Sequence, residues 1–122
     1  MGIVWHGRYA SFFEDARVAL GDRVGLGYMD YYRRGVMTPI KQLHFDYRSP
    51  LRFGDEFTVE AILHWTEAAR INMEFVVRDP GGEVATTGYT VQMMLDLSGE
   101  VLLVPPPFHQ EVMERWRRGD IS

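Results

Sequence analysis

Apolar side chains recur at helical spacing near the start of the chain. They follow the i, i+3, i+4, i+7 pattern of one helical face at Tyr9, Phe12, Phe13, Ala16, Ala19 and Leu20. At about 100° per residue these positions share roughly a third of the helix circumference, while Ser11, Glu14 and Val18 point the other way. The pattern predicts an amphipathic helix that begins after a turn at His6-Gly7 and covers a broad apolar surface.

Alternating apolar and polar positions follow, and they supply that surface as strands. We expect strands at residues 36–47, 57–65, 71–78 and 85–95, and a short last strand at 101–104. The faces expected to be apolar carry Leu43, Phe45 and Tyr47, then Phe57, Val59, Ala61, Leu63 and Trp65, then Ile71, Met73, Phe75 and Val77, and then Ala85, Thr87, Tyr89, Val91, Met93 and Leu95. Pro39 predicts an edge position or a bulge, and residues 79–82 (Asp-Pro-Gly-Gly) predict a hairpin turn.

Two further segments flank the strands. Residues 28–35 are aromatic and polar without a clear period, which predicts a connecting loop or a short helix; the functional alternative is a lid or wall of a binding cleft. Residues 108–118 predict a terminal helix with Phe108, Val112 and Trp116 on one side.

One helix followed by antiparallel strands is an α+β architecture, and no linker or repeat divides it, so we expect a single domain over residues 1–122. Periodicity alone also permits a cystatin-like or other helix-on-sheet fold. The expected core consists of Phe12, Phe13, Leu43, Phe45, Val59, Met73, Phe75, Val91 and Met93.

Composition narrows the function classes. The net charge of −4 argues against nonspecific nucleic-acid binding. The chain has no cysteine, which excludes disulfides, a thiolate nucleophile and cysteine-ligated zinc, and fits the cytoplasm. No apolar run approaches the ~20 residues of a membrane span.

Few residues suggest chemistry by spacing alone. His44, His64 and His109 are scattered without metal-ligand spacing, and Ser11, Ser49 and Ser98 lie outside a Gly-x-Ser-x-Gly motif. His6-Gly7 stand at a predicted helix N-terminus, where backbone N–H groups stabilise developing negative charge. The alternative is that these two residues only form a tight turn into the helix.

Two motifs carry a family resemblance. The segment Gly-Ile-Val-Trp-His-Gly-Arg-Tyr at residues 2–9, followed by Phe-Phe-Glu-Asp-Ala-Arg at 12–17, resembles the helix start of the hot-dog acyl-CoA thioesterases. The closest group is the 4-hydroxybenzoyl-CoA thioesterase type, including the Tol-Pal-associated thioesterases. Residues 47–55 (Tyr-Arg-Ser-Pro-Leu-Arg-Phe-Gly-Asp) also fit. The resemblance implies a hot-dog fold, in which a curved antiparallel sheet wraps around one long central helix.

The resemblance also implies site residues. A main-chain N–H near His6 and Gly7 would polarise the thioester carbonyl, and Trp5, Arg48, Ser49 and Arg52 would contact substrate and the CoA phosphates. The alternative for the three residues at 48, 49 and 52 is a charged, soluble strand end. In the family, an aspartate a few residues before the glycine that Gly2 matches assists hydrolysis. The sequence begins at Met1, so this aspartate has no counterpart in it and the first family strand is cut to residues 3–5 or missing. Either the sequence starts late, or this member of the family works without that residue.

Another carboxylate would then have to assist. Glu14 is the candidate, because a second branch of the family uses a helix carboxylate; Asp15 and Asp46 have less claim. The alternative for Glu14 is a solvated side chain that pairs with Arg17.

The expected function is therefore hydrolysis of an acyl-CoA to a free acid and CoA, without a metal or redox cofactor. The cleft would lie between protomers of a homodimer or homotetramer. The alternative is a non-catalytic hot-dog subunit that binds an acyl thioester or serves a structural role, which the missing aspartate favours.

Overall fold

The computed structural model describes residues 8–49, 51–52 and 54–120. Its elements in chain order are α1 (Arg8–Val24), α2 (Tyr28–Tyr32), β1 (Val36–Met37), β2 (Ile40–Tyr47), β3 (Thr58–His64), β4 (Arg70–Arg78), β5 (Val84–Met93), β6 (Leu95–Asp96) and α3 (Pro107–Arg117). The order of helix, strands and terminal helix is the one that the sequence predicts.

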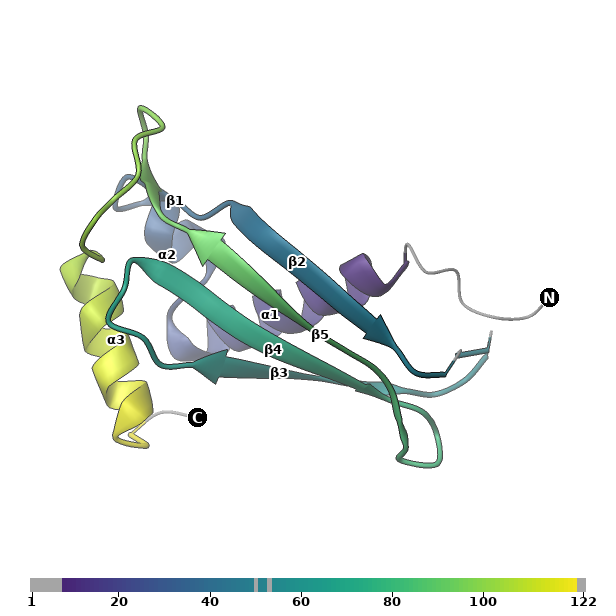
Figure 1. Ribbon diagram of the computed structural model, residues 1–122. Helices are drawn as coiled ribbons and strands as arrows, with labels where there is room; N and C mark the ends of the chain where they lie inside the picture. The colour runs from purple at the N-terminus through teal and green to yellow at the C-terminus, as the bar shows by residue number, and fades with distance from the viewer. Residues whose placement is uncertain (1–7, 50, 53, 121–122) are drawn as a thin grey trace.

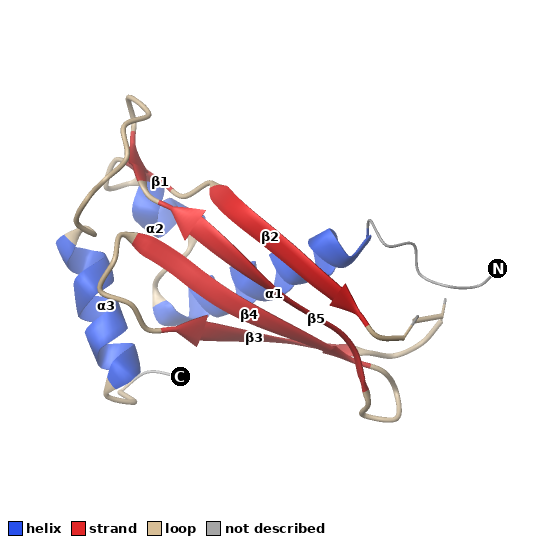
Figure 2. Cartoon of the chain, in the orientation of Figure 1, coloured by secondary structure: helices blue, strands red, loops and turns tan. Residues whose placement is uncertain are grey.

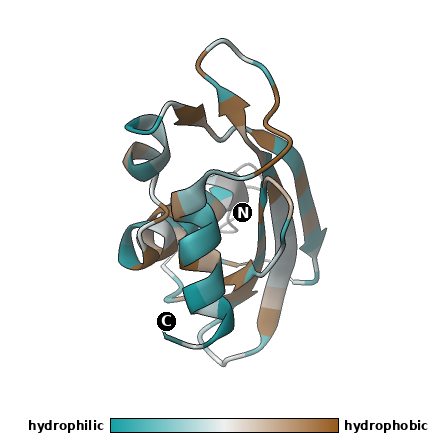
Figure 3. Cartoon of the chain, turned by 90° about the vertical axis from the view of Figure 1, so that its left-hand side faces the viewer, coloured by the Kyte–Doolittle hydropathy of each residue, from teal (hydrophilic) through white to brown (hydrophobic). Residues whose placement is uncertain are grey.

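The four long strands form one antiparallel sheet in the order β2-β5-β4-β3, and β1 pairs with β6 in a separate two-stranded ladder (Figure 1). α1 runs across one face of the large sheet, and α3 lies at one end of it (Figure 2). Seen from that end, α1 and α2 lie on the same side of the sheet, and no described helix covers the other side (Figure 3). The chain is thus a helix-on-sheet sandwich with one open sheet face.

Phe13 anchors α1 on the sheet. Its side chain is 2% exposed, stacks on Phe75 of β4 at 4.5 Å between ring centroids and tilts against Phe45 of β2 at 4.9 Å. Gly88 of β5 makes this approach possible, because a Cβ atom there would lie 2.4 Å from the Phe13 ring and 2.4 Å from the carbonyl oxygen of His44. The aromatic face that the sequence predicts therefore meets the sheet where β5 has no side chain.

The boundary of the buried face of α1 differs from the prediction at two positions. Ala19 is exposed, while Arg17 is 6% exposed. Apolar spacing could not reveal a buried cation. Residues 1–7 and the side chain of Tyr9 lie outside the described part.

The prediction for residues 36–47 is correct in its extent and in its inner face, but two of the side chains on that face are less buried than expected. The strand is interrupted at residues 38–39, and β2 lies at an edge of the sheet with a register shift between Ile40 and Gln42, as Pro39 predicts. Phe45 packs against the core, but Leu43 and Tyr47 are 44% and 41% exposed. They share the inner face with Phe45, but they lie in an edge strand that α1 covers only in part, so their side chains remain partly exposed to solvent.

The prediction for β5 chose the wrong face. Residues opposite one another across antiparallel strands share a face, and Phe75 pairs with Gly88 and Met73 with Thr90. The helix-facing side of β5 is therefore its small and polar side, Thr86, Gly88, Thr90 and Gln92, all of them buried. Val91 and Met93 lie on the opposite face and do not belong to the core, because the close approach of Phe13 excludes bulky side chains from the inner face of β5.

Two expectations near the C-terminus also change. Residues 101–104 form no strand: Val101 makes only an isolated bridge to Leu95, and the following residues bend away towards α3. In α3, the fully buried side chains are His109 and Met113, and the predicted stripe of Phe108, Val112 and Trp116 is only partly buried beside them.

Candidate active site

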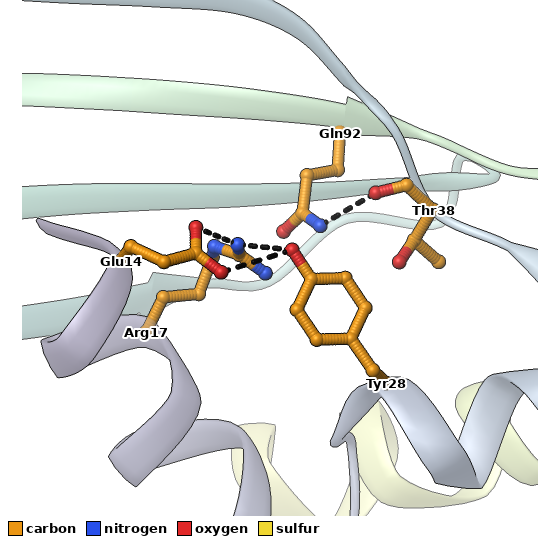
Figure 4. A network of polar contacts seen from close by, with 5 residues as sticks. All are labelled: Glu14, Arg17, Tyr28, Thr38 and Gln92. Atoms are coloured by element: carbon orange, nitrogen blue, oxygen red, sulfur yellow. Dashed lines mark hydrogen bonds and ion pairs between the residues drawn. The ribbon is translucent and has the colours of Figure 1, made fainter. Parts of the chain in front are cut away.

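A carboxylate, a guanidinium and a phenol meet between α1 and α2 (Figure 4). Arg17 Nη2 donates hydrogen bonds to Glu14 Oε2 and to the hydroxyl oxygen of Tyr28. The Tyr28 hydroxyl donates to the other carboxylate oxygen, Glu14 Oε1, at 3.1 Å. The guanidinium carbon of Arg17 also lies 4.7 Å from the centroid of the Tyr28 ring. Both carboxylate oxygens of Glu14 are thus held by donors from two different helices.

Burial differs sharply among the three side chains. The Arg17 side chain is 7% exposed, the Glu14 side chain is 40% exposed, and Tyr28 is 46% exposed. Removing a guanidinium from water is costly unless an opposite charge and hydrogen bonds compensate for the lost hydration. Glu14 and Tyr28 supply both, and their exposure leaves the carboxylate within reach of water and of a ligand.

A compact turn between α1 and α2 brings Tyr28 to this position. The N–H of Leu26 donates to the carbonyl of Gly21 at 2.8 Å, and Gly25 adopts a φ of 85°, which favours glycine. The N–H of Gly27 donates to the Asp30 carboxylate at 2.8 Å and so begins α2. Tyr28 is the first residue of α2, and its ring therefore points back towards α1.

A cavity of about 250 Å³ opens beside this network. Its wall includes Arg17, Tyr28 and Thr38 and extends to β4 at Met73 and to β5 at Gln92. Gln92 is 1% exposed, and its Nε2 donates to the backbone carbonyl of Thr38 at 2.7 Å, which ties β5 to the segment between β1 and β2 (Figure 4). The cavity therefore combines charged, hydroxyl and amide groups with an apolar wall.

Among the predicted site residues, the structure describes Glu14 on α1 and a second group after β2. Glu14 lies in the network, where it pairs with Arg17 as its alternative interpretation supposes. It does not itself line the cavity, but both of its partners, Arg17 and Tyr28, do. Trp5, His6 and Gly7 lie outside the described residues.

Arg48, Ser49 and Arg52 follow β2. The backbone N–H groups of Arg48 and Ser49 both donate to the carbonyl of Ala85, and the N–H of Arg52 donates to Asp55 Oδ2 at 2.8 Å. All three side chains are exposed, and that of Arg48 lies 3.6 Å from Asp46. The end of β2 lies near the start of α1 in Figure 1, so the cations stand at the same end of the molecule as the start of the helix.

Tyr28 and Gln92 are the site residues that the sequence identifies least well. The prediction of a cleft wall at residues 28–35 includes Tyr28 without giving it a role. Gln92 lies on the polar face of β5. The sequence does not show that this polar face is the inner one, because that depends on the ring of Phe13 occupying the space over Gly88.

The described histidines have structural contacts. His64 Nε2 lies 3.0 Å from Glu74 on the open sheet face, and His44 stacks on Tyr89 at 5.1 Å. His109 is buried and hydrogen-bonds Tyr31. In the described ranges, no group of three or more histidine, cysteine or acidic residues is arranged to hold a metal ion. Nor does any described helix have the length and apolar character needed to cross a membrane.

Comparison with known proteins adds family information to this geometry. The model of the "Thioesterase-like superfamily" matches residues 1–116. A relative from Bacillus subtilis (strain 168), named "Putative acyl-CoA thioesterase YneP", is 26% identical over 96 residues, which make up 79% of this chain and 70% of the relative.

Solved structures share the fold. The DHNA-CoA thioesterase from Staphylococcus aureus aligns with a TM-score of 0.81 at 24% identity, over 100% of this chain and 87% of that chain. A thioesterase from Thermus thermophilus, solved in complex with coenzyme A and Zn, aligns with a TM-score of 0.76 at 24% identity, over 97% of this chain and 83% of that chain. These similarities confirm the predicted α+β hot-dog fold.

Proposed function

The chain belongs to the thioesterase-like superfamily, and from this premise we propose that it hydrolyses an acyl-CoA thioester to a free acid and CoA with Glu14 as the assisting carboxylate. The family match, which covers residues 1–116, is the observation that carries the proposal. It confirms the resemblance noted in the sequence, and the names of the similar proteins support thioester hydrolysis over a non-catalytic role.

Hydrolysis needs a base and a place for negative charge. In the proposed reaction, a water oxygen attacks the carbonyl carbon while Glu14 accepts a proton from that water. The C–S bond then breaks, and the CoA thiolate leaves and takes up a proton. Arg17 and Tyr28 orient the Glu14 carboxylate through their hydrogen bonds. We assign the carbonyl oxygen to backbone N–H groups near His6 and Gly7, as the resemblance implies.

CoA itself requires cations for its phosphates. We propose Arg48 and Arg52 for this role, with Ser49 as a hydrogen-bonding partner and Trp5 as a contact of the substrate. The exposure of the three residues after β2 supports their availability. In addition, we propose a cytoplasmic protein that acts as a homodimer or homotetramer, since the chain has no cysteine and the β2 edge of the sheet is open.

Release of free CoA tests the proposal directly. The chain contains no cysteine, so a thiol reagent reports CoA without any background from the protein. A panel of acetyl-, hexanoyl-, octanoyl- and benzoyl-CoA should show protein-dependent thiol release with at least one ester. Binding of these esters without thiol release from any of them would instead support the non-catalytic subunit.

A further inference from the structure

A second, larger cavity adjoins the network. It measures about 630 Å³ and lies between α2 and the start of the strands. Its lining consists of Tyr28, Met29, Tyr32, Val36, Met37, Thr38, Pro39, Ile40 and Leu95. We call this cavity the α2 groove. Its volume falls within the range of small-molecule sites, about 300–1,000 Å³.

The α2 groove is apolar and uncharged. Its lining contains no acidic or basic side chain, and the hydroxyl of Tyr28 is already engaged with Glu14 and Arg17. Met29, Tyr32 and Ile40 are 55%, 58% and 43% exposed, an unusual concentration of large apolar side chains on one surface. A ligand that fits this surface has an extended apolar body and needs no ionic partner.

The α2 groove shares part of its wall with the cavity of the candidate active site. Tyr28, Met29 and Thr38 line both the cavity beside Glu14 and the α2 groove. The hydroxyl of Tyr28, a residue that belongs to both walls, lies 3.1 Å from Glu14 Oε1. A thioester carbonyl placed beside Glu14 would therefore lie next to Tyr28, a residue that also lines the α2 groove.

The opposite direction suits the other half of the substrate. The start of β2 borders the α2 groove, while Arg48 and Ser49 follow the end of β2, which lies at the same end of the molecule as the start of α1 (Figure 1). An extended eight-residue strand spans roughly 25 Å. Acyl and CoA halves laid along α1 would thus reach an apolar surface at one end and cations at the other.

We propose that the α2 groove binds the aliphatic acyl chain of the substrate and makes the protein selective for medium-length over short acyl groups. This inference rests on the proposed thioesterase function and adds the class of acyl group. An acetyl group would leave most of the groove unfilled. The methionines Met29 and Met37 favour a flexible chain, because their unbranched side chains adapt to ligands of varying shape.

Non-hydrolysable S-alkyl-CoA thioethers test the groove separately from catalysis. Calorimetric titration of S-ethyl-, S-butyl-, S-hexyl- and S-octyl-CoA should show affinity that rises about fourfold for each methylene that enters the groove, which is ~0.8 kcal/mol converted at 1.36 kcal/mol per decade. The same order should appear in kcat/KM for the matching acyl-CoAs, with octanoyl favoured over acetyl by roughly 10²-fold or more.

A charge placed in the groove should abolish this dependence. Met29→Glu introduces a carboxylate at a side chain that is 55% exposed, so the variant should fold, yet it should lose most of the gain between S-ethyl- and S-octyl-CoA. Leu103→Glu is the matched control, because Leu103 is 91% exposed and lies outside the groove lining. The control should keep the chain-length dependence of the unmodified protein.

The outcomes separate the two proposals. A chain-length gradient in thioether binding, lost in Met29→Glu, supports the groove even if no ester is hydrolysed, in which case only the proposed function fails. Hydrolysis with equal kcat/KM for acetyl- and octanoyl-CoA, unchanged in Met29→Glu, overturns the groove and leaves the function standing. Loss of self-association in Met29→Glu without a change in chain-length dependence would assign the groove to a second copy of the chain and likewise overturn the proposal.

Discussion

Arg17 is the residue on which the candidate site depends. Its guanidinium is buried in an otherwise apolar helix face, so it requires a nearby carboxylate to compensate for its lost hydration. Glu14, one turn earlier on the same helix, supplies that carboxylate. The same pair could serve stability alone. What distinguishes Glu14 is its partial exposure, with a hydroxyl group from a second helix on its other oxygen and with both partners, Arg17 and Tyr28, lining a cavity.

A second buried polar contact lies at the other end of α2. The Tyr31 hydroxyl is 2.7 Å from His109 Nδ1, and the two side chains are each 1% exposed. Among the described residues, His109 Nε2 has no hydrogen-bond partner. Burial lowers the pKa of His109 from 6.5 to about 4, and burial together with the nearby Asp30 carboxylate raises the pKa of Tyr31 well above its usual value. The pair therefore joins α2 to α3 in its neutral form.

The lowered pKa of His109 predicts a loss of stability in acid. The unfolded chain takes up a proton near pH 6.5, whereas the folded chain resists protonation until about pH 4. Above pH 6.5 the burial of neutral His109 therefore does not lower the free energy of unfolding. As the pH drops from 6.5 towards 4, that free energy falls by up to about 3 kcal/mol. Urea unfolding at pH 7.5, 6.0 and 5.0 should show this slope.

An exposed histidine provides the comparison. His109→Gln should flatten the pH dependence between 7.5 and 5.0, while His44→Gln, at an exposed position of β2, should leave it as in the unmodified protein. Parallel slopes for His109→Gln and the unmodified protein would show that His109 does not carry the effect.

At the scale of elements, the contact between α1 and the sheet organises the core. Phe13 touches rings from β2 and β4 and fills the space above Gly88 of β5. The apolar helix face that the sequence predicts thus contacts three adjacent strands of the sheet, β2, β5 and β4, through this one side chain.

Truncation of this ring tests the contact. Phe13→Ala should lower the free energy of unfolding by roughly 3–5 kcal/mol, because it removes a side chain that is 2% exposed and leaves a cavity. Leu103→Ala, at a position that is 91% exposed, should change it by about 0.5 kcal/mol or less. A loss below ~1 kcal/mol for Phe13→Ala, measured in urea, would mean that the helix packs on another face.

The sequence predicts elements better than it predicts their orientation. The alternation in β4 agrees with its burial, because Ile71, Met73, Phe75 and Val77 form a buried apolar side of a central strand. In β5 the bulky apolar side chains, Val91 and Met93 among them, lie on the outer face, so their bulk suggests the wrong face. Only the packed position of Phe13 reveals that the inner face had to be small at Gly88.

The candidate site could be predicted only in part for a similar reason. The family resemblance singled out Glu14, and the aromatic, aperiodic composition of residues 28–35 singled out the segment that contains Tyr28. The burial of Arg17 and the approach of Gln92 to Thr38 depend on how α1, β5 and the segment before β2 pack together. No local pattern contains that information.

At the scale of the whole molecule, the described chain leaves an edge and a face of its sheet uncovered. β2 forms one edge, and its side chains Ile40, Leu43 and Tyr47 are 43%, 44% and 41% exposed. Open edges with apolar side chains favour pairing with another chain. This arrangement supports the proposed homo-oligomer.

Sedimentation equilibrium tests that proposal. At micromolar concentration the protein should have at least twice the mass of its 14.1 kDa chain, through symmetric contacts that include the β2 edge. Leu43→Glu should weaken the association, whereas Leu103→Glu should not. A stable monomer for the unmodified protein would contradict both the oligomer and a cleft shared between protomers.

The central claim is that the Glu14 carboxylate assists thioester hydrolysis. Glu14→Gln should lower kcat in the thiol-release assay by about 10²–10⁴-fold, the usual contribution of general-base assistance. Asp15→Asn is the matched control: it neutralises the adjacent, exposed carboxylate of the same helix and should leave kcat within about twofold.

Because Glu14 also pairs with buried Arg17, the decisive measurement is kcat for Glu14→Gln and for the double variant Glu14→Gln/Arg17→Met, each with its unfolding free energy. The double variant removes the whole ion pair and should recover stability lost in the single variant, since apolar replacement of a buried pair is often neutral. The account predicts that kcat stays low in both. Recovery of kcat in the double variant, or loss of kcat in Asp15→Asn but not in Glu14→Gln, would contradict it.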